Sequence, residues 1–415
     1  MKSNYYIRNE CRLCGEKEQN LVLPLEPSAL CDAFITSKKL DIKQQLFPLD
    51  LYQCAKCGHA QISCIVDPET IYEDYIYVSS SSLDLSSHFR KYADEVIKRI
   101  KPDNSTLIID IGSNDGIFLK NFKNKGMRVL GIEPAQDIVK EAIKNNIDTV
   151  AGYFNSDFAE QIKNDFGNAN IVTVNNLFAN IDQLKDFVIG IKKILDKNGM
   201  LIIEASYLLD LIENMVFDYI YHEHLSYFSI KPLSIFFNNL GMEIFDVEKM
   251  PTKGGSIRIF IQFANGPQQI NEIVSKMINN EVVKGLYDST IWQQFNDQIS
   301  NRKLLIRSML KDFQIQGKTI AGYGGSATST TLIHHFGLND YISYIFDDNQ
   351  AKHNTYSPGF HIPVLSSDMI YEKNPDYIVL LAWRFNKPII EKHKIFLSQG
   401  GNFILPLPNL KIIKQ

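Results

Sequence analysis

Hydrophobic residues along this chain follow two patterns. Some form short continuous runs, which predict buried strands, and others recur every three or four residues, which predicts amphipathic helices. Residues 84–100 carry apolar side chains at helical spacing behind Ser and Asp residues that can cap a helix. Residues 106–124 predict a strand, a glycine-containing loop and a helix, and 128–134 predict another strand. The alternation continues with a helix at 136–146, a strand at 170–176, a helix around 181–195 and a strand at 199–206. Strands that alternate with helices indicate a parallel, doubly wound sheet.

A second alternating region lies nearer the C-terminus. Residues 251–265 predict a late strand of the first sheet, and 268–313 are helical and polar on one side, as in a bridge. From residue 318 strands and a helix alternate again around a glycine-rich turn at 322–326, which could wrap a diphosphate or be a plain tight turn. We therefore predict an α/β protein with an N-terminal module, a central Rossmann-like domain, a helical bridge and a C-terminal Rossmann-like α/β domain, at residues 1–72, 73–265, 266–312 and 313–415.

Composition narrows the possible partners. The 415 residues are 45% hydrophobic and 22% charged, with a net charge of −4. Binding to nucleic acid needs a basic face, so we expect no nucleic-acid partner. No run approaches the roughly 18 apolar residues of a membrane span, and the N-terminus lacks the apolar core of a signal peptide. We therefore expect a cytoplasmic protein without a membrane partner.

Two CxxC-Gly knuckles lie in the N-terminal module. They contain Cys11 with Cys14 and Cys54 with Cys57. Zinc prefers four thiolates in a tetrahedron, and each knuckle supplies two of them. A redox dithiol is the alternative, but it does not explain the duplication. We predict a structural zinc site, which leaves no open coordination position for catalysis.

The loop at 110–116, between the predicted strand and helix, suits a nucleoside cofactor. Asp110 is followed by Gly112, Asn114 and Gly116, and the glycines allow the backbone to approach a ligand closely. The pattern is not the G-x-G-x-x-G of nicotinamide cofactors. Glu133 ends the next strand, where an acid commonly accepts hydrogen bonds from ribose hydroxyls. The alternative is that Glu133 merely caps a helix.

The segment 219–229 is dense in acid–base side chains and follows a predicted strand, where clefts open in such sheets. His224 is a candidate general base for removing a proton next to a carbonyl group, and Glu223 could orient its ring. Tyr and Asn donors such as Tyr221 could stabilise the resulting enolate. A metal site or a purely structural cluster are the alternatives, but no HExxH helix is present.

These motifs together resemble a known family. Two CxxC knuckles, a Tyr- and Ser-rich stretch at 75–82, DIGSNDG, GIEP, YHEHLSYFS, GGSIR, GYGG and PGFHIPV follow one another in this order. The chain resembles the sugar C-methyltransferases over nearly its whole length. The resemblance implies a zinc domain, a methyltransferase domain that uses S-adenosylmethionine, and a C-terminal domain that helps to hold a nucleotide-linked sugar. It also implies methyl transfer to a carbon next to a keto group.

The resemblance assigns roles to particular positions, with His224 as base, Glu223 as its partner, and Tyr221 and Tyr77 in contact with the sugar. The catalytic positions are His224, Glu223, Tyr221, Tyr77 and Asn180. The cofactor-binding positions are Asp110, Gly112, Asn114, Gly116, Glu133, Pro134, Phe154, Asn175 and Asn176. The substrate-binding positions are Tyr75, Ser79, Lys253, Gly255, Tyr323, Gly324, Ser326, Trp383 and Arg384.

The chain departs from the family pattern at several positions. Asn180, Lys253 and Arg384 replace a common His, His and Asn, and Thr328 replaces a common Lys. These changes leave the identity of the sugar and nucleotide open. Methylation at oxygen or nitrogen by the same scaffold, and a binding protein that does not methylate, remain alternatives. The oligomeric state, monomer or dimer, is also open.

Overall fold

The computed structural model describes residues 4–72, 83–100 and 102–415. It confirms the α/β class, with two large sheets of seven and eight strands and two small ones. None of the helices in these residues is long and apolar enough to cross a membrane. The predicted positions Tyr75, Tyr77 and Ser79 lie outside the described residues.

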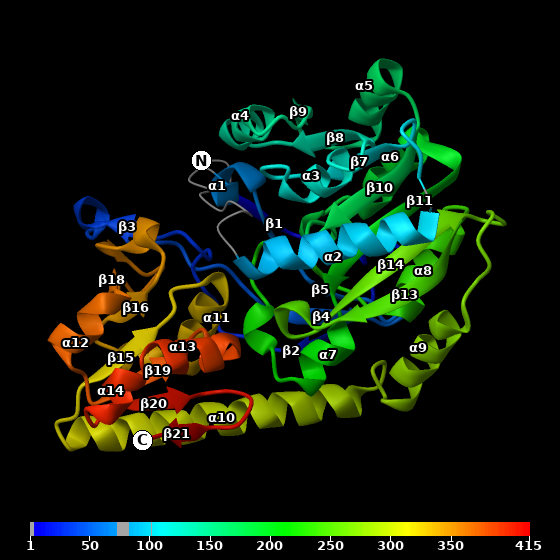
Figure 1. Ribbon diagram of the computed structural model, residues 1–415. Coiled ribbons are helices and arrows are strands. Elements are labelled where there is room, and N and C mark those ends of the chain that lie inside the picture. Colours follow the sequence, from blue (N-terminus) through cyan, green and yellow to red (C-terminus); the bar gives the residue numbers. More distant parts are fainter. Residues whose placement is uncertain (1–3, 73–82, 101) are drawn as a thin grey trace.

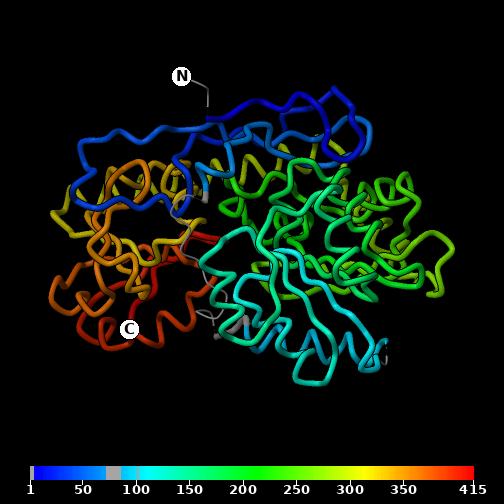
Figure 2. Tube along the Cα trace, turned by 90° about the horizontal axis from the view of Figure 1, so that it is seen from above, coloured from blue at the N-terminus to red at the C-terminus, as the bar shows by residue number. Residues whose placement is uncertain are grey.

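The N-terminal segment forms a small antiparallel sheet of order β12–β5–β4–β2. The strand β12 comes from the centre of the chain and pairs with β5. Figure 2 shows the N-terminal segment, in blue, lying across both the central and the C-terminal parts. The elements are β1 (Tyr5–Ile7), β2 (Gln19–Leu23), β3 (Ile35–Thr36), β4 (Leu51–Cys54), β5 (Ala60–Ile62), β6 (Cys64–Val66), α1 (Pro68–Tyr72) and β12 (Ser226–Tyr227).

The central sheet has the order β13–β14–β11–β10–β7–β8–β9. Its last five strands run parallel, β14 pairs antiparallel with β11, and β13 pairs antiparallel with β14. The strands are β7 (Leu107–Ile111), β8 (Arg128–Glu133), β9 (Thr149–Ala151), β10 (Ala169–Asn175), β11 (Leu195–Ser206), β13 (Met242–Met250) and β14 (Ser256–Phe263).

Helices cover both faces of this sheet, as a doubly wound fold requires. Phe89 of α2 packs with Phe118 of α3 on one face, and Phe187 of α6 packs on the other. Figure 1 shows α2 crossing the sheet. The helices are α2 (Leu83–Ile100), α3 (Ile117–Lys123), α4 (Gln136–Lys144), α5 (Ser156–Phe166), α6 (Leu184–Ile194), α7 (Leu208–Glu213) and α8 (Ile230–Asn239), with the short turns η3 (Phe178–Asn180) and η4 (Phe217–Tyr219).

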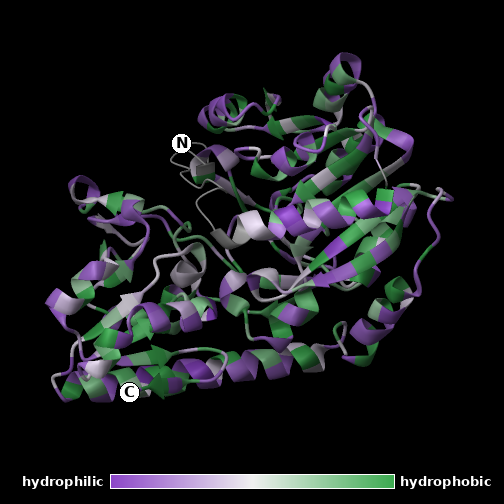
Figure 3. Ribbon diagram, in the orientation of Figure 1, coloured by the Kyte–Doolittle hydropathy of each residue, from purple (hydrophilic) through white to green (hydrophobic). Residues whose placement is uncertain are grey.

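The helical bridge consists of α9 (Glu272–Val283) and the 27-residue α10 (Ser289–Ile315). In Figure 1, α10 runs along the base of the molecule from the central part to the C-terminal part. Figure 3 shows hydrophilic and hydrophobic residues alternating along it. Trp292, Phe295 and Ile299 are buried, so one side of α10 packs against the rest of the protein while the other side faces water.

The C-terminal sheet has the order β21–β20–β19–β15–β16–β18–β17–β3. Its five middle strands are parallel, and β3 joins its edge from the N-terminal segment. The N-terminal segment therefore contributes β3 to the C-terminal sheet, whereas its own small sheet takes in β12 from the central part of the chain. The elements are β15 (Ile320–Tyr323), α11 (Ala327–Phe336), β16 (Ile345–Asp347), β17 (Thr355–Tyr356), β18 (Pro363–Ser366), α12 (Ile370–Lys373), β19 (Tyr377–Leu380), α13 (Asn386–Lys392), α14 (Lys394–Ser398), β20 (Asn402–Leu405) and β21 (Lys411–Ile413).

Candidate active site

The four knuckle cysteines meet in one cluster. The Sγ atoms of Cys11 and Cys57 are 3.6 Å apart, as are those of Cys14 and Cys54, and all four lie within 4.8 Å of one another. Zinc–sulfur bonds of about 2.3 Å in a tetrahedron place sulfur atoms about 3.8 Å apart. The cluster therefore fits a structural zinc ion. The nearby His59 does not belong to this cluster, and its Nε2 contacts the Ser226 hydroxyl at 3.1 Å.

The glycine loop after β7 needs its glycines for two reasons. Gly112 and Gly116 both have φ of +76°, a left-handed conformation that side chains disfavour. A Cβ on Gly112 would lie 2.8 Å from the Leu177 side chain, and one on Gly116 would lie 2.9 Å from Ile147. The loop is thus pressed against its surroundings, and Asn114 within it is also left-handed, with φ of +49°.

Glu133, at the end of β8, joins two loops. Its carboxylate accepts hydrogen bonds from the backbone N–H of Asn114 at 3.1 Å and of Ala135 at 3.0 Å. Burial raises the pKa of this carboxyl. Each carboxylate oxygen has a second lone pair, so the group can also accept from a bound ribose. Pro134, directly after it, is exposed.

A buried polar pair lies beneath the same loop. Asp110 Oδ1 accepts hydrogen bonds from the Thr173 hydroxyl at 2.6 Å and from Asn175 Nδ2 at 3.1 Å. Burial raises the pKa of Asp110 to about 7. Within the described part of the chain, the buried Asn175 Oδ1 has no hydrogen-bond partner. A buried acceptor without a donor suits a polar ligand, so these residues fit S-adenosylmethionine.

The remaining predicted cofactor residues lie around this site. Asn176 has φ of +57° and donates its backbone N–H to the Glu204 carbonyl at 2.8 Å. Phe154, after β9, packs edge-on against Phe187 of α6 with ring centroids 5.3 Å apart. The Asn176 backbone is therefore held at the end of β10, while Phe154 is partly buried against a helix.

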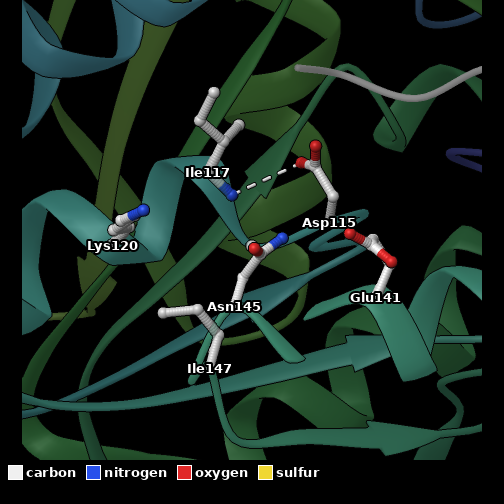
Figure 4. Close-up of a pocket in the computed structure, with 7 residues that line it drawn as sticks. Asp115, Ile117, Lys120, Glu141, Asn145 and Ile147 are labelled. Atoms are coloured by element: carbon white, nitrogen blue, oxygen red, sulfur yellow. Dashed lines mark hydrogen bonds between the residues drawn. The ribbon is translucent and has the colours of Figure 1, made fainter. Parts of the chain in front are cut away.

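A cavity of about 290 Å³ lies on the helical side of the glycine loop, between α3 and α4. Figure 4 shows Asp115, Lys120, Glu141 and Asn145 around it, with the Ile117 N–H donating to Asp115. Of the predicted cofactor positions, only Gly116 lines this cavity. It is distinct from the cluster formed by Asp110, Glu133 and Asn175.

The predicted base, His224, is held at both ring nitrogens. Its Nδ1 lies 3.2 Å from the Tyr219 carbonyl oxygen, and its Nε2 lies 3.1 Å from the Tyr221 hydroxyl. A carbonyl only accepts, so the proton of the neutral ring belongs on Nδ1 and Nε2 accepts from Tyr221. Burial, together with the positive charges of Lys253 and Arg384, lowers the pKa of His224 to about 3.

Glu223 does not take the orienting role expected for it. Among the described residues no hydrogen bond joins it to His224, whose ring is oriented by the Tyr219 carbonyl instead. Burial and the negative charge of Asp32 raise the pKa of Glu223 to about 7. His222 faces away toward the N-terminal segment, with Nε2 3.1 Å from the Pro48 carbonyl.

Asp218 connects this segment to the C-terminal domain. The buried carboxylate accepts hydrogen bonds from Trp383 Nε1 at 2.8 Å and from Arg384 Nη1 at 3.3 Å. The Arg384 guanidinium lies 5.4 Å from the centroid of the Tyr219 ring. Nothing in the sequence pattern distinguished Asp218 as functional, because its partners Trp383 and Arg384 lie far away in the chain.

A cavity of about 640 Å³ opens between the central and C-terminal domains. Three predicted substrate-binding residues, Gly255, Trp383 and Arg384, line it. Gly255 has φ of +130°, and a Cβ there would collide with Asp210. Lys253 is exposed, with φ of +56°, and its charge acts on both Glu223 and His224.

The other predicted positions are placed differently. Tyr323 is buried in the C-terminal domain, where its hydroxyl donates to Asp348 at 2.9 Å. Gly324 has φ of +97°, and Ser326 caps α11. Asn180 ends η3, beside the predicted base, because the Leu225 N–H donates to the Ala179 carbonyl at 2.7 Å. The structure thus brings Asn180 to the His224 segment and directs the Tyr323 side chain into a core.

Comparisons with known proteins place the domains of this chain in known families. Family models described as "Putative zinc binding domain", "Methyltransferase domain" and "C-methyltransferase C-terminal domain" match residues 11–72, 85–247 and 251–408. C-methyltransferase NovU of Streptomyces niveus is 30% identical over 406 residues, which cover 98% of this chain and 97% of NovU.

Solved structures match a little under half of the chain. The PH0226 protein from Pyrococcus horikoshii OT3 is 12% identical, covers 47% of this chain and 98% of its own, and has a TM-score of 0.36. A SAM-dependent methyltransferase from Anabaena variabilis is 14% identical, covers 44% and 96%, and has a TM-score of 0.33.

Fold, cysteine cluster and family models together define an S-adenosylmethionine-dependent methyltransferase with a structural zinc site. Because the likeness to NovU extends over nearly the whole of both chains, the particular family follows from it. The chain belongs to the C-methyltransferase family that includes NovU.

Proposed function

We propose that this protein transfers a methyl group to the carbon next to the keto group of a nucleotide-linked sugar, with His224 as the base. The observation that carries the proposal is the hydrogen bond between the Tyr221 hydroxyl and His224 Nε2. The His224 imidazole is neutral, because its pKa is lowered to about 3, and the Tyr219 carbonyl holds its Nδ1. None of the six cysteines, all of which lie in the described residues, forms a disulfide, which is the state that a reducing compartment maintains, and this supports a cytoplasmic location.

A carbon next to a carbonyl becomes a nucleophile when it loses a proton. The Tyr221 hydroxyl donates to His224 Nε2. The Tyr221 oxygen can therefore take the substrate proton as its own hydroxyl proton passes to Nε2, while the C–H electron pair moves into the enolate. The Tyr221 hydroxyl or the Asn180 amide can donate a hydrogen bond to the enolate oxygen. Bound S-adenosylmethionine would supply the electrophilic methyl group.

The low pKa of His224 is compatible with this role once an anionic substrate is bound. Positive charge on Lys253 and Arg384 contributes to the lowered pKa. A nucleotide-linked sugar carries a diphosphate, which would offset these charges and make the imidazole more basic. Arg384 also lines the 640 Å³ cavity, which supports the cavity as the place where the diphosphate binds.

The proposal is tested with labelled S-adenosylmethionine, a panel of nucleotide-linked keto-sugars and mass analysis of the products. We expect His224→Asn to bind S-adenosylmethionine normally but to lose at least about 100-fold in turnover, because general-base catalysis typically contributes that much. The matched control is His222→Asn, since His222 faces Pro48, and it should retain turnover. Equal turnover in the two variants would remove His224 from the role of base.

Deuterium exchange distinguishes carbon methylation from the alternatives. With an inert cofactor analogue bound, the wild-type protein in D₂O should exchange the hydrogen next to the keto group, and His224→Asn should not. Methyl transfer without such exchange would indicate methylation at oxygen or nitrogen. Binding of the sugar nucleotide with neither exchange nor transfer would indicate a protein that does not methylate.

A further inference from the structure

The zinc module and the His224 segment share one sheet. Directly after His224, the backbone enters β12, whose Ser226 and Tyr227 pair with Gln61 and Ala60 of β5. The Ile62 N–H donates to the Leu225 carbonyl at 3.1 Å, which extends the same pairing. The residues that follow the base are thus an edge strand of the sheet that carries the second zinc knuckle.

Arg12 lies between two of the zinc ligands and reaches toward the same place. Its side chain is fully buried, and Nη1 donates to the carbonyls of Ile62 at 2.8 Å and Leu225 at 3.1 Å. Its Nε donates to Asp182 Oδ1 at 3.0 Å. A guanidinium presents its donors in one rigid plane, so these contacts fix the directions of their acceptors.

Two of these three acceptors, Leu225 and Asp182, belong to the two segments that form the walls of the candidate site, the His224 segment and the Asn180 segment. Leu225 directly follows His224, and Asp182 lies two residues after Asn180. The walls also contact each other, because the Leu225 N–H donates to the Ala179 carbonyl at 2.7 Å. One buried side chain therefore connects the zinc module to both segments.

We propose that Arg12 is a positioning residue, which holds the His224 and Asn180 segments in register with each other and couples both to the zinc module. The inference rests on the proposed role of His224 as base. If so, the zinc module does more than stabilise its own fold, because its first knuckle, which contains Arg12, orients the Arg12 guanidinium toward the candidate active site.

The test compares Arg12→Lys with Arg8→Lys. Lysine retains the charge but has one nitrogen, which cannot reach both walls as the guanidinium does. Arg8 is the matched control, because its Nη1 also contacts Asp182, at 3.0 Å, and no contact joins it to Leu225 among the described residues. In Arg12→Lys we expect kcat to fall about 10- to 100-fold with KM, S-adenosylmethionine Kd and zinc content unchanged. Arg8→Lys should stay within about two-fold of wild type in each.

A second readout does not depend on activity. Hydrogen–deuterium exchange of the 221–228 backbone, followed by mass spectrometry, should speed up in Arg12→Lys and not in Arg8→Lys. If the wild-type protein methylates no keto-sugar, the proposed function is wrong, but the exchange rate of the 221–228 backbone still tests whether Arg12 positions this segment.

Two outcomes overturn the inference. One is unchanged kcat and unchanged exchange in Arg12→Lys. The other is loss of zinc or of S-adenosylmethionine binding in parallel with kcat, which would make the role of Arg12 purely structural. Asp182→Asn, which leaves both knuckles intact, should show a smaller loss of kcat of the same selective kind, and an unchanged kcat there would remove Asp182 from the arrangement.

Discussion

The two glycine-rich turns of this protein follow the same strand–turn–helix plan but differ in how their polar groups are satisfied. In the first turn, α3 begins after Gly116, which has no side chain to cap the helix. In the second turn, α11 begins after Ser326, whose hydroxyl and that of Ser329 form a capping box. The second helix start is therefore capped by its own N-cap hydroxyl, whereas the first has no N-cap side chain and a long contact, 3.4 Å, from the Ile117 N–H to Asp115.

The acids at the ends of the neighbouring strands show the same difference. Glu133 accepts from two backbone N–H groups, and Asn175, at the end of β10 on the other side of β7, has a buried Oδ1 without a partner in the part of the chain that the structure describes. In the second turn Asp347 accepts from Gly325 N–H at 2.6 Å, and Lys352 donates to the Gly325 carbonyl at 2.7 Å. Similar sequence patterns thus produce two different turns. Near the first, a buried acceptor, Asn175 Oδ1, is left without a hydrogen bond among the described residues. In the second, the N–H and the carbonyl of Gly325 are both hydrogen-bonded to neighbouring side chains.

We expect the largest contrast from a methyl group added to each turn. Gly112→Ala should destabilise the fold by about 1–3 kcal/mol through the left-handed backbone, and contact with Leu177 should displace the loop. The Kd for S-adenosylmethionine should then rise by about 100-fold, which corresponds to ~2.7 kcal/mol. Calorimetric titration measures this.

The matched control is Gly324→Ala in the second turn. Its φ of +97° and the nearby Ala382 impose comparable strain. This variant should lower the melting temperature but leave the Kd for S-adenosylmethionine unchanged. If the two variants weaken cofactor binding equally, the distinction between the turns is wrong.

A smaller effect is expected from the buried Asp110 of the first turn. Its folded-state pKa of about 7 lies above the ordinary value of about 3.9, so the folded protein holds this proton more tightly than the unfolded chain. The stabilising contribution is fully present below about pH 4 and declines as pH rises toward 7, by at most ~1.4 kcal/mol per pH unit.

Denaturant unfolding of the cofactor-free protein and of Asp110→Asn between pH 5 and 8 measures this contribution. The free energy of unfolding of the wild type, relative to the variant, should decrease as pH rises to 7 and then level off. A relative stability that increases with pH would contradict the raised pKa.

The smallest effect is expected from Ser326→Ala in the second turn. Loss of a helix N-cap costs about 1 kcal/mol, which thermal unfolding can detect. Cofactor binding should not change. The KM for the sugar nucleotide tests whether Ser326 binds substrate. A raised KM would support contact between this turn and the diphosphate. An unchanged KM would reject Ser326 as a substrate-binding residue.

By itself, the sequence determined the alternation of strands and helices in the two large sheets, the four knuckle cysteines and the α/β class, because periodicity and short motifs report on neighbours in the chain. The strands β9 and β13 and the helices α5, α7 and α8 were not predicted; in β13 a bulge between Ile244 and Asp246 interrupts the alternation of side chains. Only the tertiary structure decided that Tyr219, and not Glu223, orients His224, and that β3 and β12 join sheets of other domains. Arg12 meets Leu225 across 213 positions, and Trp383 meets Asp218 across 165. A hydrogen bond between such distant residues depends on how the sheets pack, and it leaves no periodic pattern in the chain.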